Sequence, residues 1–381
     1  MERTGPRLTR PLLGRLRLVS QGLVGAGFAS VPEAVRTMTA MQAQDLPAAL
    51  WAVGVRVPGA ALADVRDALD RGEVVRSWPM RGTLHLLAPE DLGWILQITS
   101  GRLLRSLGAR HRQLDITSAD IDAAADAALQ RVAGGAAVSR AELFEAFDHA
   151  GQSPAGQRGI HLLAALCQLG LLVLGPLAGN QQLVVAFDDW ITASRTLDRA
   201  EGTAEWLLRY LLSHGPATER DFAWWSGIPL TETRAALAQI RDQLAELEFE
   251  GNRYWLAPET AALLAEGVPG GRSVLALPGF DEFVLGYTDR SVVLPADHAD
   301  KIVPGGNGVF KKTIVAGGQV VGTWSATARR GRAVAGGNQG AGGNQGVVVV
   351  AEPFEGRDGL RPAARHSFEL RAAEYRRFLG L

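Results

Sequence analysis

Two glutamines separated by one residue, Gln42 and Gln44, are the side chains whose types and spacing suggest chemistry most directly. An amide is neither a useful acid nor a useful base, but it can hold a water molecule and direct its dipole at a developing charge. If the pair is catalytic, it therefore serves a reaction whose leaving group departs easily. The alternative is that both glutamines lie at an ordinary exposed helix end.

The geometry of the pair and the role of its neighbour depend on where the preceding helix ends. Residues two positions apart lie on opposite sides of a helix but on one side of an extended chain, so the helix must end near Gln42 if both amides face one substrate. Asp45 is a rival for activating water, because a carboxylate is the stronger base. It also precedes Pro47, as a capping or turn residue would. The sequence leaves both roles of Asp45 open.

Several other chemistries lack the residues they need. The only lysines are Lys301, Lys311 and Lys312, so the first 300 residues contain neither a P-loop lysine nor a Schiff-base lysine. The seven histidines are scattered, and the chain has no HExxH and no CxxC motif. We therefore expect no metal and no other cofactor.

Composition predicts a globular protein with a sizeable core. The chain has 381 residues, of which 47 % are hydrophobic and 21 % are charged, and this length suffices for two to four domains. No apolar run reaches the roughly 18 residues that span a bilayer, and the first twenty residues lack a signal-peptide pattern. With the single cysteine, Cys167, no intrachain disulfide is possible. These features predict a reduced, cytoplasmic location and no membrane partner.

Charge is balanced overall, with a formal net charge of −1, but it is unevenly distributed. Arginines or lysines dominate residues 1–20, 92–114 and 301–350, whereas acids outnumber arginines in residues 201–260. Separate basic and acidic surfaces are typical of a protein with one face toward a polyanion. The alternative is that arginine-rich usage reflects a GC-rich genome and ordinary solvated faces.

The elements that must position the glutamines follow the order of a winged helix–turn–helix unit. Helical spacing covers residues 8–21 and 32–42, and another helix is expected at about 60–70. A short apolar strand is expected over Leu50 to Val57. Residues 74–87 predict a hairpin around the turn at 79–82.

The same order recurs twice, and a strand-rich region follows. We predict an α+β fold of three tandem winged helix–turn–helix units and a C-terminal antiparallel β-barrel with a basic hairpin and a final helix. The expected barrel strands include 273–277, 283–287, 313–316, 319–324 and 347–351, and the low-complexity segment 336–346 is expected to be a loop. The predicted domains are 1–112 with the glutamines, 113–196, 197–270 and 271–381.

The chain resembles the winged-helix DNA glycosylase superfamily, in particular its AlkZ-type branch, which unhooks interstrand crosslinks made by azinomycin-type alkylators. Four motifs carry this resemblance along almost the whole length. They are the glutamine–aliphatic–glutamine motif at 42–44, WPMRGTLHL at 78–86, LPGFDEFVLGY at 277–287, and NGVFKKTIV with GGQVVGTW at 307–315 and 317–324.

The resemblance implies three winged helices and a β-barrel around a DNA-binding channel, with both glutamines essential for hydrolysis. A sister branch has aspartate at the second motif position. Here that position is Gln44, which favours the branch acting on bulky adducts and crosslinks. The duplicated Gly-Gly-Asn-Gln segment within 336–346 departs from the family pattern.

The chemistry of an N7-alkylated guanine suits an amide pair. This base carries a positive charge, so its glycosidic bond already leans toward an oxocarbenium sugar and a neutral base that needs little protonation. Two amide oxygens can hold the attacking water and place dipoles against the charge on the sugar, an effect worth roughly 10²–10³-fold per dipole.

A second group of residues is expected to contact DNA. Arg81 at the hairpin tip is a natural phosphate ligand, and basic residues beside barrel strands would enter the minor groove. His85 could contact phosphate or lie in a polar pair within the strand, and the basic residues could instead protect a sheet edge. The predicted DNA-binding residues are Arg81, Thr83, His85, Lys311, Lys312, Arg329, Arg330 and Arg332.

These inferences predict a monofunctional DNA glycosylase that hydrolyses bulky N7-alkylguanine adducts, including interstrand crosslinks, with Gln42 and Gln44 as catalytic residues and Asp45 as a possible third. Its expected partner is double-stranded DNA containing alkylated guanine, and we expect a monomer without an obligate protein partner. Two alternatives remain from other classes: a winged-helix transcriptional regulator, and a resistance protein that sequesters the alkylating drug.

Overall fold

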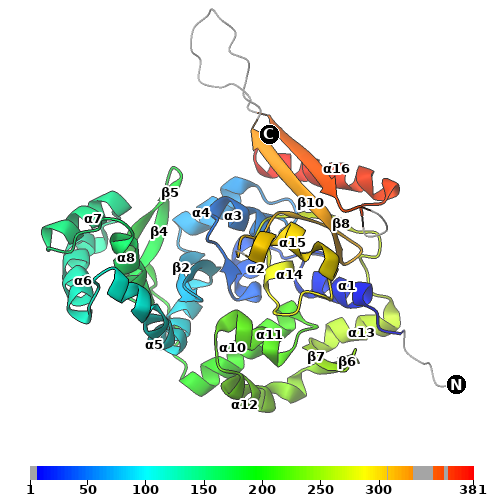
Figure 1. The fold of residues 1–381 in the computed structure, drawn as a ribbon, viewed down its shortest axis with the longest axis horizontal. Coiled ribbons are helices and arrows are strands. Elements are labelled where there is room, and N and C mark those ends of the chain that lie inside the picture. Colours follow the sequence, from blue (N-terminus) through cyan, green and yellow to red (C-terminus); the bar gives the residue numbers. More distant parts are fainter. Residues whose placement is uncertain (1–6, 307, 329–345, 356–358) are drawn as a thin grey trace, which may run out of the picture.

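The computed structural model describes residues 7–306, 308–328, 346–355 and 359–381, and within them helices surround three separate antiparallel sheets (Figure 1). The largest sheet has the strand order β1-β3-β2-β4-β5, the second has the order β11-β10-β9-β8, and the third is the hairpin β6-β7. Helices and sheets thus coexist as the predicted α+β class requires.

In the first part of the chain, four helices precede a hairpin. Thr9, Ser30 and Asp45 cap the first three of these helices, and each helix has a proline in its first turn. The elements are α1 (Arg10–Ser20), α2 (Val31–Met38), β1 (Met41–Gln42), α3 (Leu46–Gly54), α4 (Leu62–Asp70), β2 (Val75–Met80) and β3 (Thr83–Leu87).

The strand expected over Leu50 to Val57 is wrong, because this segment belongs mainly to helix α3. Every residue of α3 from Ala48 to Gly54 is buried. A helix buried on all sides shows no polar face, so its apolar run cannot be told from a buried strand by periodicity. The Asp45 cap and Pro47 were the signals that favoured a helix.

The second part of the chain adds its hairpin to the first sheet. Strand β4 pairs with β2 at Leu174 and Arg76, so one five-stranded sheet spans both hairpins. Ser139 and Glu142 form a capping box through reciprocal hydrogen bonds at the start of α7. The elements are α5 (Pro89–Gln113), α6 (Ser118–Val132), α7 (Arg140–His149), α8 (Arg158–Gln168), β4 (Leu172–Ala178) and β5 (Gln181–Ala186).

An aromatic core joins the third part of the chain to α5. Trp206 makes edge contacts with Trp94, Phe222 and Trp225, and Trp94 is 1 % exposed and belongs to the core. The elements are α9 (Phe187–Trp190), α10 (Arg199–His214), α11 (Glu219–Ser226), α12 (Leu230–Ile240), β6 (Ala245–Phe249), β7 (Asn252–Leu256) and α13 (Pro258–Glu266).

The C-terminal part is a four-stranded antiparallel sheet covered by a long helix (Figure 1). Tyr375 of this helix, α16, packs edge-on against Trp51 and Trp324. The elements are β8 (Val274–Leu277), α14 (Glu282–Leu285), α15 (Ala299–Ile302), β9 (Thr313–Ala316), β10 (Gln319–Ala328), β11 (Val347–Pro353) and α16 (Pro362–Phe378), and short 3-10 turns lie at Ala133–Gly135, Arg241–Gln243, Ala296–His298 and Pro304–Gly306.

Two expectations for this region need correction. The predicted strand at 283–287 is wrong, because residues Glu282–Leu285 form helix α14, which the Asp281 side chain caps. The barrel is not confirmed: in the described residues β8 pairs only with β9, and β11 only with β10, so the sheet stays open. The division into three winged helices remains a proposal.

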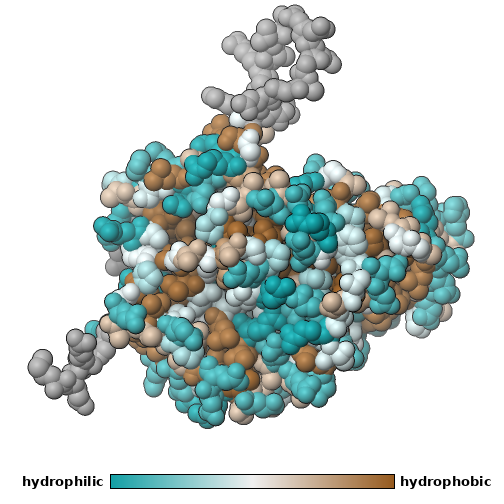
Figure 2. All heavy atoms as spheres, turned by 180° about the vertical axis from the view of Figure 1, so that it is seen from behind, coloured by the Kyte–Doolittle hydropathy of each residue, from teal (hydrophilic) through white to brown (hydrophobic). Residues whose placement is uncertain are grey.

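The surface carries no single extended apolar face in the view of Figure 2, where hydrophilic and hydrophobic residues are interspersed. Large apolar side chains that are exposed include Trp224, Val309 and Leu370, which come from separate elements. None of the helices in the described ranges is both long and apolar enough to cross a membrane.

Candidate active site

The glutamine motif lies on an extended segment and not on a helix. Helix α2 ends at Met38, and the chain then forms β1, in which Gln42 pairs with His85 of β3. Ala43, between the two glutamines, is fully buried and its N–H donates to Leu84 O at 2.7 Å. Because side chains alternate along an extended chain, we expect Gln42 and Gln44 to point away from the side on which Ala43 is buried.

The two amides differ in their hydrogen bonds. The Gln44 side chain is exposed, and its Oε1 accepts from Leu84 N at 3.2 Å. The Gln42 Oε1 is buried yet has no hydrogen-bond partner among the described residues. A buried acceptor without a partner is rare in native proteins and is often completed by water or by a ligand. The Gln42 amide oxygen therefore has an unused acceptor inside the protein.

Asp45 caps helix α3. Its Oδ1 accepts from Ala48 N at 3.2 Å, so the capping interpretation is confirmed. Its negative charge also acts on Lys312. Burial lowers the pKa of Lys312 more than the charge of Asp45 raises it, so this pKa lies below its ordinary value. The carboxylate remains exposed. Its role as a base stays a prediction.

A buried carboxylate, Glu282, holds the backbone of the motif from behind. Its Oε1 accepts from Gln42 N at 3.0 Å and its Oε2 from Trp225 Nε1 at 2.9 Å, while His214 Nε2 lies 3.6 Å from Oε2. Burial alone would raise the pKa of Glu282, but His214, Arg81 and the Gln42 N–H outweigh it and lower the pKa to about 2. Glu282 therefore carries its charge at neutral pH.

Arg76 holds the other side of the same backbone. Its Nε and Nη2 donate to Ala43 O at 2.9 and 2.7 Å, and its Nη1 donates to Gln182 Oε1 at 3.1 Å. Burial lowers the pKa of Arg76 to about 10, with a smaller contribution from Arg140, so the side chain remains charged at neutral pH. Elements from three parts of the chain thus fix the extended motif.

His85 lies beneath the motif and is fully buried. Its Nδ1 is 2.9 Å from Thr83 O, and its Nε2 is 3.4 Å from Arg81 Nη2, which fits an Nδ1–H donor and an Nε2 acceptor. Burial, helped by the charge of Arg81, lowers its pKa to about 3. The predicted polar pair is therefore observed with Arg81. The predicted contact of His85 with DNA is untested. In the protein without DNA, the His85 side chain has no exposed surface.

Arg81 occupies a backbone position that arginine rarely takes. Arg81 and Gly82 form a two-residue turn between the paired residues Met80 and Thr83, with φ values of 53° and 69°. Such turns favour asparagine or glycine, so the arginine side chain must serve another purpose. Thr39 before β1 and Phe280 before Glu282 also have positive φ. Three of the five such non-glycine residues in the described chain thus flank this site.

The other residues predicted to contact DNA differ in how exposed their side chains are. Lys311 is exposed, and Lys312 is partly buried with its Nζ 4.9 Å from the centre of the Trp324 ring. The Thr83 side chain has a buried hydroxyl with no partner among the described residues. Arg329, Arg330 and Arg332 lie outside the described residues.

Sequence reasoning missed Glu282 and Arg76 as parts of the site. Each offered a signal, because a charged residue in an otherwise apolar stretch must find a partner. Glu282 follows Asp281 inside the apolar run 274–287, and Arg76 interrupts the buried strand β2. Neither signal names the partner, which only the fold supplies.

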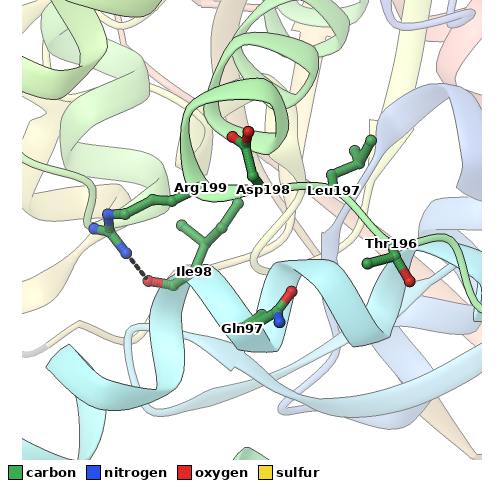
Figure 3. Close-up of a pocket in the computed structure, with 6 residues that line it drawn as sticks. All are labelled: Gln97, Ile98, Thr196, Leu197, Asp198 and Arg199. Carbon is green, nitrogen blue, oxygen red and sulfur yellow. Dashed lines mark hydrogen bonds between the residues drawn. The ribbon is translucent and has the colours of Figure 1, made fainter.

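A hollow of about 400 Å³ lies elsewhere, between α5 and the start of α10 (Figure 3). Gln97, Ile98, Thr196, Leu197, Asp198 and Arg199 line it, so neither glutamine of the motif takes part. Across the described ranges, no group of three His, Cys, Asp or Glu side chains could hold a metal ion.

Comparisons with known proteins agree with this architecture. A curated relative, the interstrand DNA cross-link repair glycosylase of Streptomyces sahachiroi, is 26 % identical over 332 residues, which cover 77 % of this chain and 82 % of the relative. The solved structure of Streptomyces sahachiroi DNA glycosylase AlkZ has the same fold, with a TM-score of 0.78 and 23 % identity over 98 % of this chain and 97 % of that one.

The strongest comparison is at the level of the family. The sequence model described as "DNA glycosylase AlkZ-like" matches residues 35–378 and therefore includes the glutamines, both hairpins of the first sheet and the C-terminal sheet. DNA glycosylases hydrolyse N-glycosyl bonds. Because the match spans nearly the whole sequence, this chain belongs to the AlkZ-like family of DNA glycosylases.

Proposed function

We propose that this glycosylase is monofunctional and releases bulky N7-alkylguanine bases from double-stranded DNA, including bases joined in interstrand crosslinks. The observation that carries the proposal is the extended Gln42-Ala43-Gln44 segment, with its two amides on one side and the unpartnered oxygen of Gln42. The name of the Streptomyces sahachiroi relative, a cross-link repair glycosylase, supports the substrate class.

The proposed reaction needs little acid catalysis. The C1′–N9 bond breaks, and its electron pair neutralises the cationic guanine, which leaves as a neutral base. Gln42 and Gln44 hold a water molecule and direct their amide dipoles at the positive charge that develops on the sugar. The water oxygen then bonds to C1′ and loses a proton, which gives an abasic site. His85, neutral above a pKa of about 3, is not needed as an acid.

The proposed DNA surface continues from the glutamines to the basic residues around them. Arg81 is hydrogen-bonded to His85, which pairs with Gln42 in the sheet, and Lys312 lies near Asp45. Lys311 extends this surface, and Thr83, Arg329, Arg330 and Arg332 are further candidates. Such a surface suits a crosslinked lesion, which cannot rotate freely into a deep pocket.

One assay separates this proposal from the two alternatives. The protein is incubated with a duplex that contains one N7-alkylguanine, and a parallel sample receives no protein. Abasic sites are then cleaved in both samples with mild alkali without heating, because hot alkali by itself removes N7-alkylguanine and breaks the strand. A glycosylase gives strand scission at the modified guanine, whereas a regulator binds a DNA sequence without product and a sequestering protein binds the free alkylator. Intact strands after incubation with excess protein would overturn the proposal.

A further inference from the structure

An exposed tryptophan contacts two arginines beside the candidate active site. Trp224 belongs to α11 and is 38 % exposed, although large aromatic residues in this part of the chain are otherwise in the core. The guanidinium carbons of Arg81 and Arg290 lie 5.1 and 5.2 Å from the centre of its ring. Both distances are within the range of cation–π contacts.

The three residues come from different parts of the chain and meet next to the glutamine motif. Arg81 is at the tip of the β2–β3 hairpin and contacts His85, which pairs with Gln42. Arg290 follows α14, the helix that begins with Glu282, and its guanidinium also lies 5.0 Å from the Phe310 ring, next to Lys311. Arg81, Trp224 and Arg290 thus extend from the tip of the β2–β3 hairpin to the residues next to Lys311.

Within the described part of the chain neither arginine has an acidic partner at ion-pair distance, and Arg290 donates only from Nε, to Val284 O at 3.1 Å. The acids whose charges act on the two arginines lie farther away and accept other hydrogen bonds: Asp221 from Thr218 and Thr288, Asp289 from Ser291, and Glu282 from Gln42 and Trp225. Their guanidinium groups therefore have N–H donors to offer an anion.

Burial makes this arrangement unusual. It lowers the pKa of both Arg81 and Arg290, although each remains charged at neutral pH. A partly desolvated cation that forms no ion pair gains more from an incoming anion than a solvated one does. By contrast, Arg209 of α10 and Arg195, which precedes that helix, both pair with Asp91.

We propose that Arg81 and Arg290, which both contact the indole of Trp224, bind phosphates of the DNA strand that passes the glutamine motif. Planar guanidinium groups suit phosphate, and the rigid indole fixes the spacing of the two forks. The exposed part of Trp224 packs against the adjoining deoxyribose. This inference rests on the proposed function, because it assumes that DNA crosses Gln42 and Gln44.

We call Arg81, Trp224 and Arg290 the clamp. Salt-dependent binding to an undamaged duplex tests it without using catalysis. Arg290→Gln should weaken binding about tenfold at moderate salt and reduce the slope of log K against log salt by about 1, because one phosphate contact is lost. Trp224→Ala should weaken binding severalfold. Trp224→Phe should retain more affinity than Trp224→Ala, and Arg290→Lys should retain more than Arg290→Gln. Arg131→Gln, which removes an ion pair with Glu142 on α6 and α7, is the matched control.

The result that would overturn the clamp is an Arg290→Gln protein, folded by circular dichroism, whose affinity and salt slope equal those of the wild type. If Arg290→Gln misfolds, Trp224→Ala and Trp224→Phe decide in its place. Failure of the proposed function looks different: wild-type protein would bind DNA with the expected slope but release no base from alkylated duplex at any concentration.

Discussion

At the scale of single residues, the site is an amide pair whose backbone is held by charged groups. Glu282 accepts from the N–H of Gln42, and Arg76 donates to the carbonyl of Ala43. Two charges of opposite sign thus fix one short stretch of backbone. The amides supply dipoles whose value depends on their orientation, so the residues that hold this backbone should affect rate more than binding.

Glu282→Gln tests this positioning role. Glutamine keeps an acceptor for the Gln42 N–H but removes the charge that faces Arg81 and His214, so the motif should shift within its site. We expect base release with saturating protein to fall roughly tenfold, which corresponds to about 1.4 kcal/mol, while duplex affinity changes less than about twofold. Glu246→Gln, which removes an exposed partner of Arg253, is the control. Equal loss of affinity and rate would contradict a positioning role.

The buried His85 makes a prediction about pH. Its pKa in the folded protein is about 3, below the ordinary value of 6.5, so the unfolded chain binds more protons between these values. The buried, neutral His85 therefore contributes its full stability above about pH 6.5. The free energy of unfolding falls as the pH drops from 6.5 toward 3, because only the unfolded chain takes up the proton. Each pH unit in this range costs about 1.4 kcal/mol, so wild type should lose about 2 kcal/mol more than His85→Asn between pH 6.5 and 5. Urea unfolding at both pH values measures this difference, and parallel losses would contradict it.

At the scale of elements, the key feature is the switch from helix α2 to strand β1 and then to helix α3. The sequence predicted a helix over residues 32–42, but the helix ends at Met38, and Met41 and Gln42 form a strand instead. The pairing with β3 could not be foreseen, because the partner strand lies more than 40 residues later. Strand Leu50 to Val57 was wrong for a related reason: tertiary burial removed the periodic signal that distinguishes a helix.

Asp45 can be tested at this scale, since it begins α3. Asp45→Ala removes the cap and should lower the free energy of unfolding by about 0.5–2 kcal/mol, whereas Asp45→Asn keeps a capping oxygen and most of the stability. If the amide pair performs the chemistry, as we propose, Asp45→Asn should retain base release within about threefold. A loss beyond about 100-fold in a stable Asp45→Asn protein would instead make Asp45 the base.

At the scale of the whole molecule, the motifs predicted the family and the distribution of basic segments predicted a DNA-facing side. The order of helices and hairpins was largely foreseen, but the joining of two hairpins through β2 and β4 was not, because one register pair decides it. The open C-terminal sheet also departs from the expected barrel, since period-two strands look alike in both. The buried partners Glu282 and Arg76 needed the fold.

The central claim is that Gln42 and Gln44 perform hydrolysis and do not merely contact DNA. The most direct measurement is base release by a Gln42→Ala/Gln44→Ala double variant on an N7-alkylguanine duplex under single-turnover conditions, with duplex affinity measured in parallel. The exposed Gln239→Ala on α12 is the matched control. We predict a rate loss of at least about 10²–10³-fold with affinity within about threefold of wild type. A folded double variant that releases base at the wild-type rate would contradict the account.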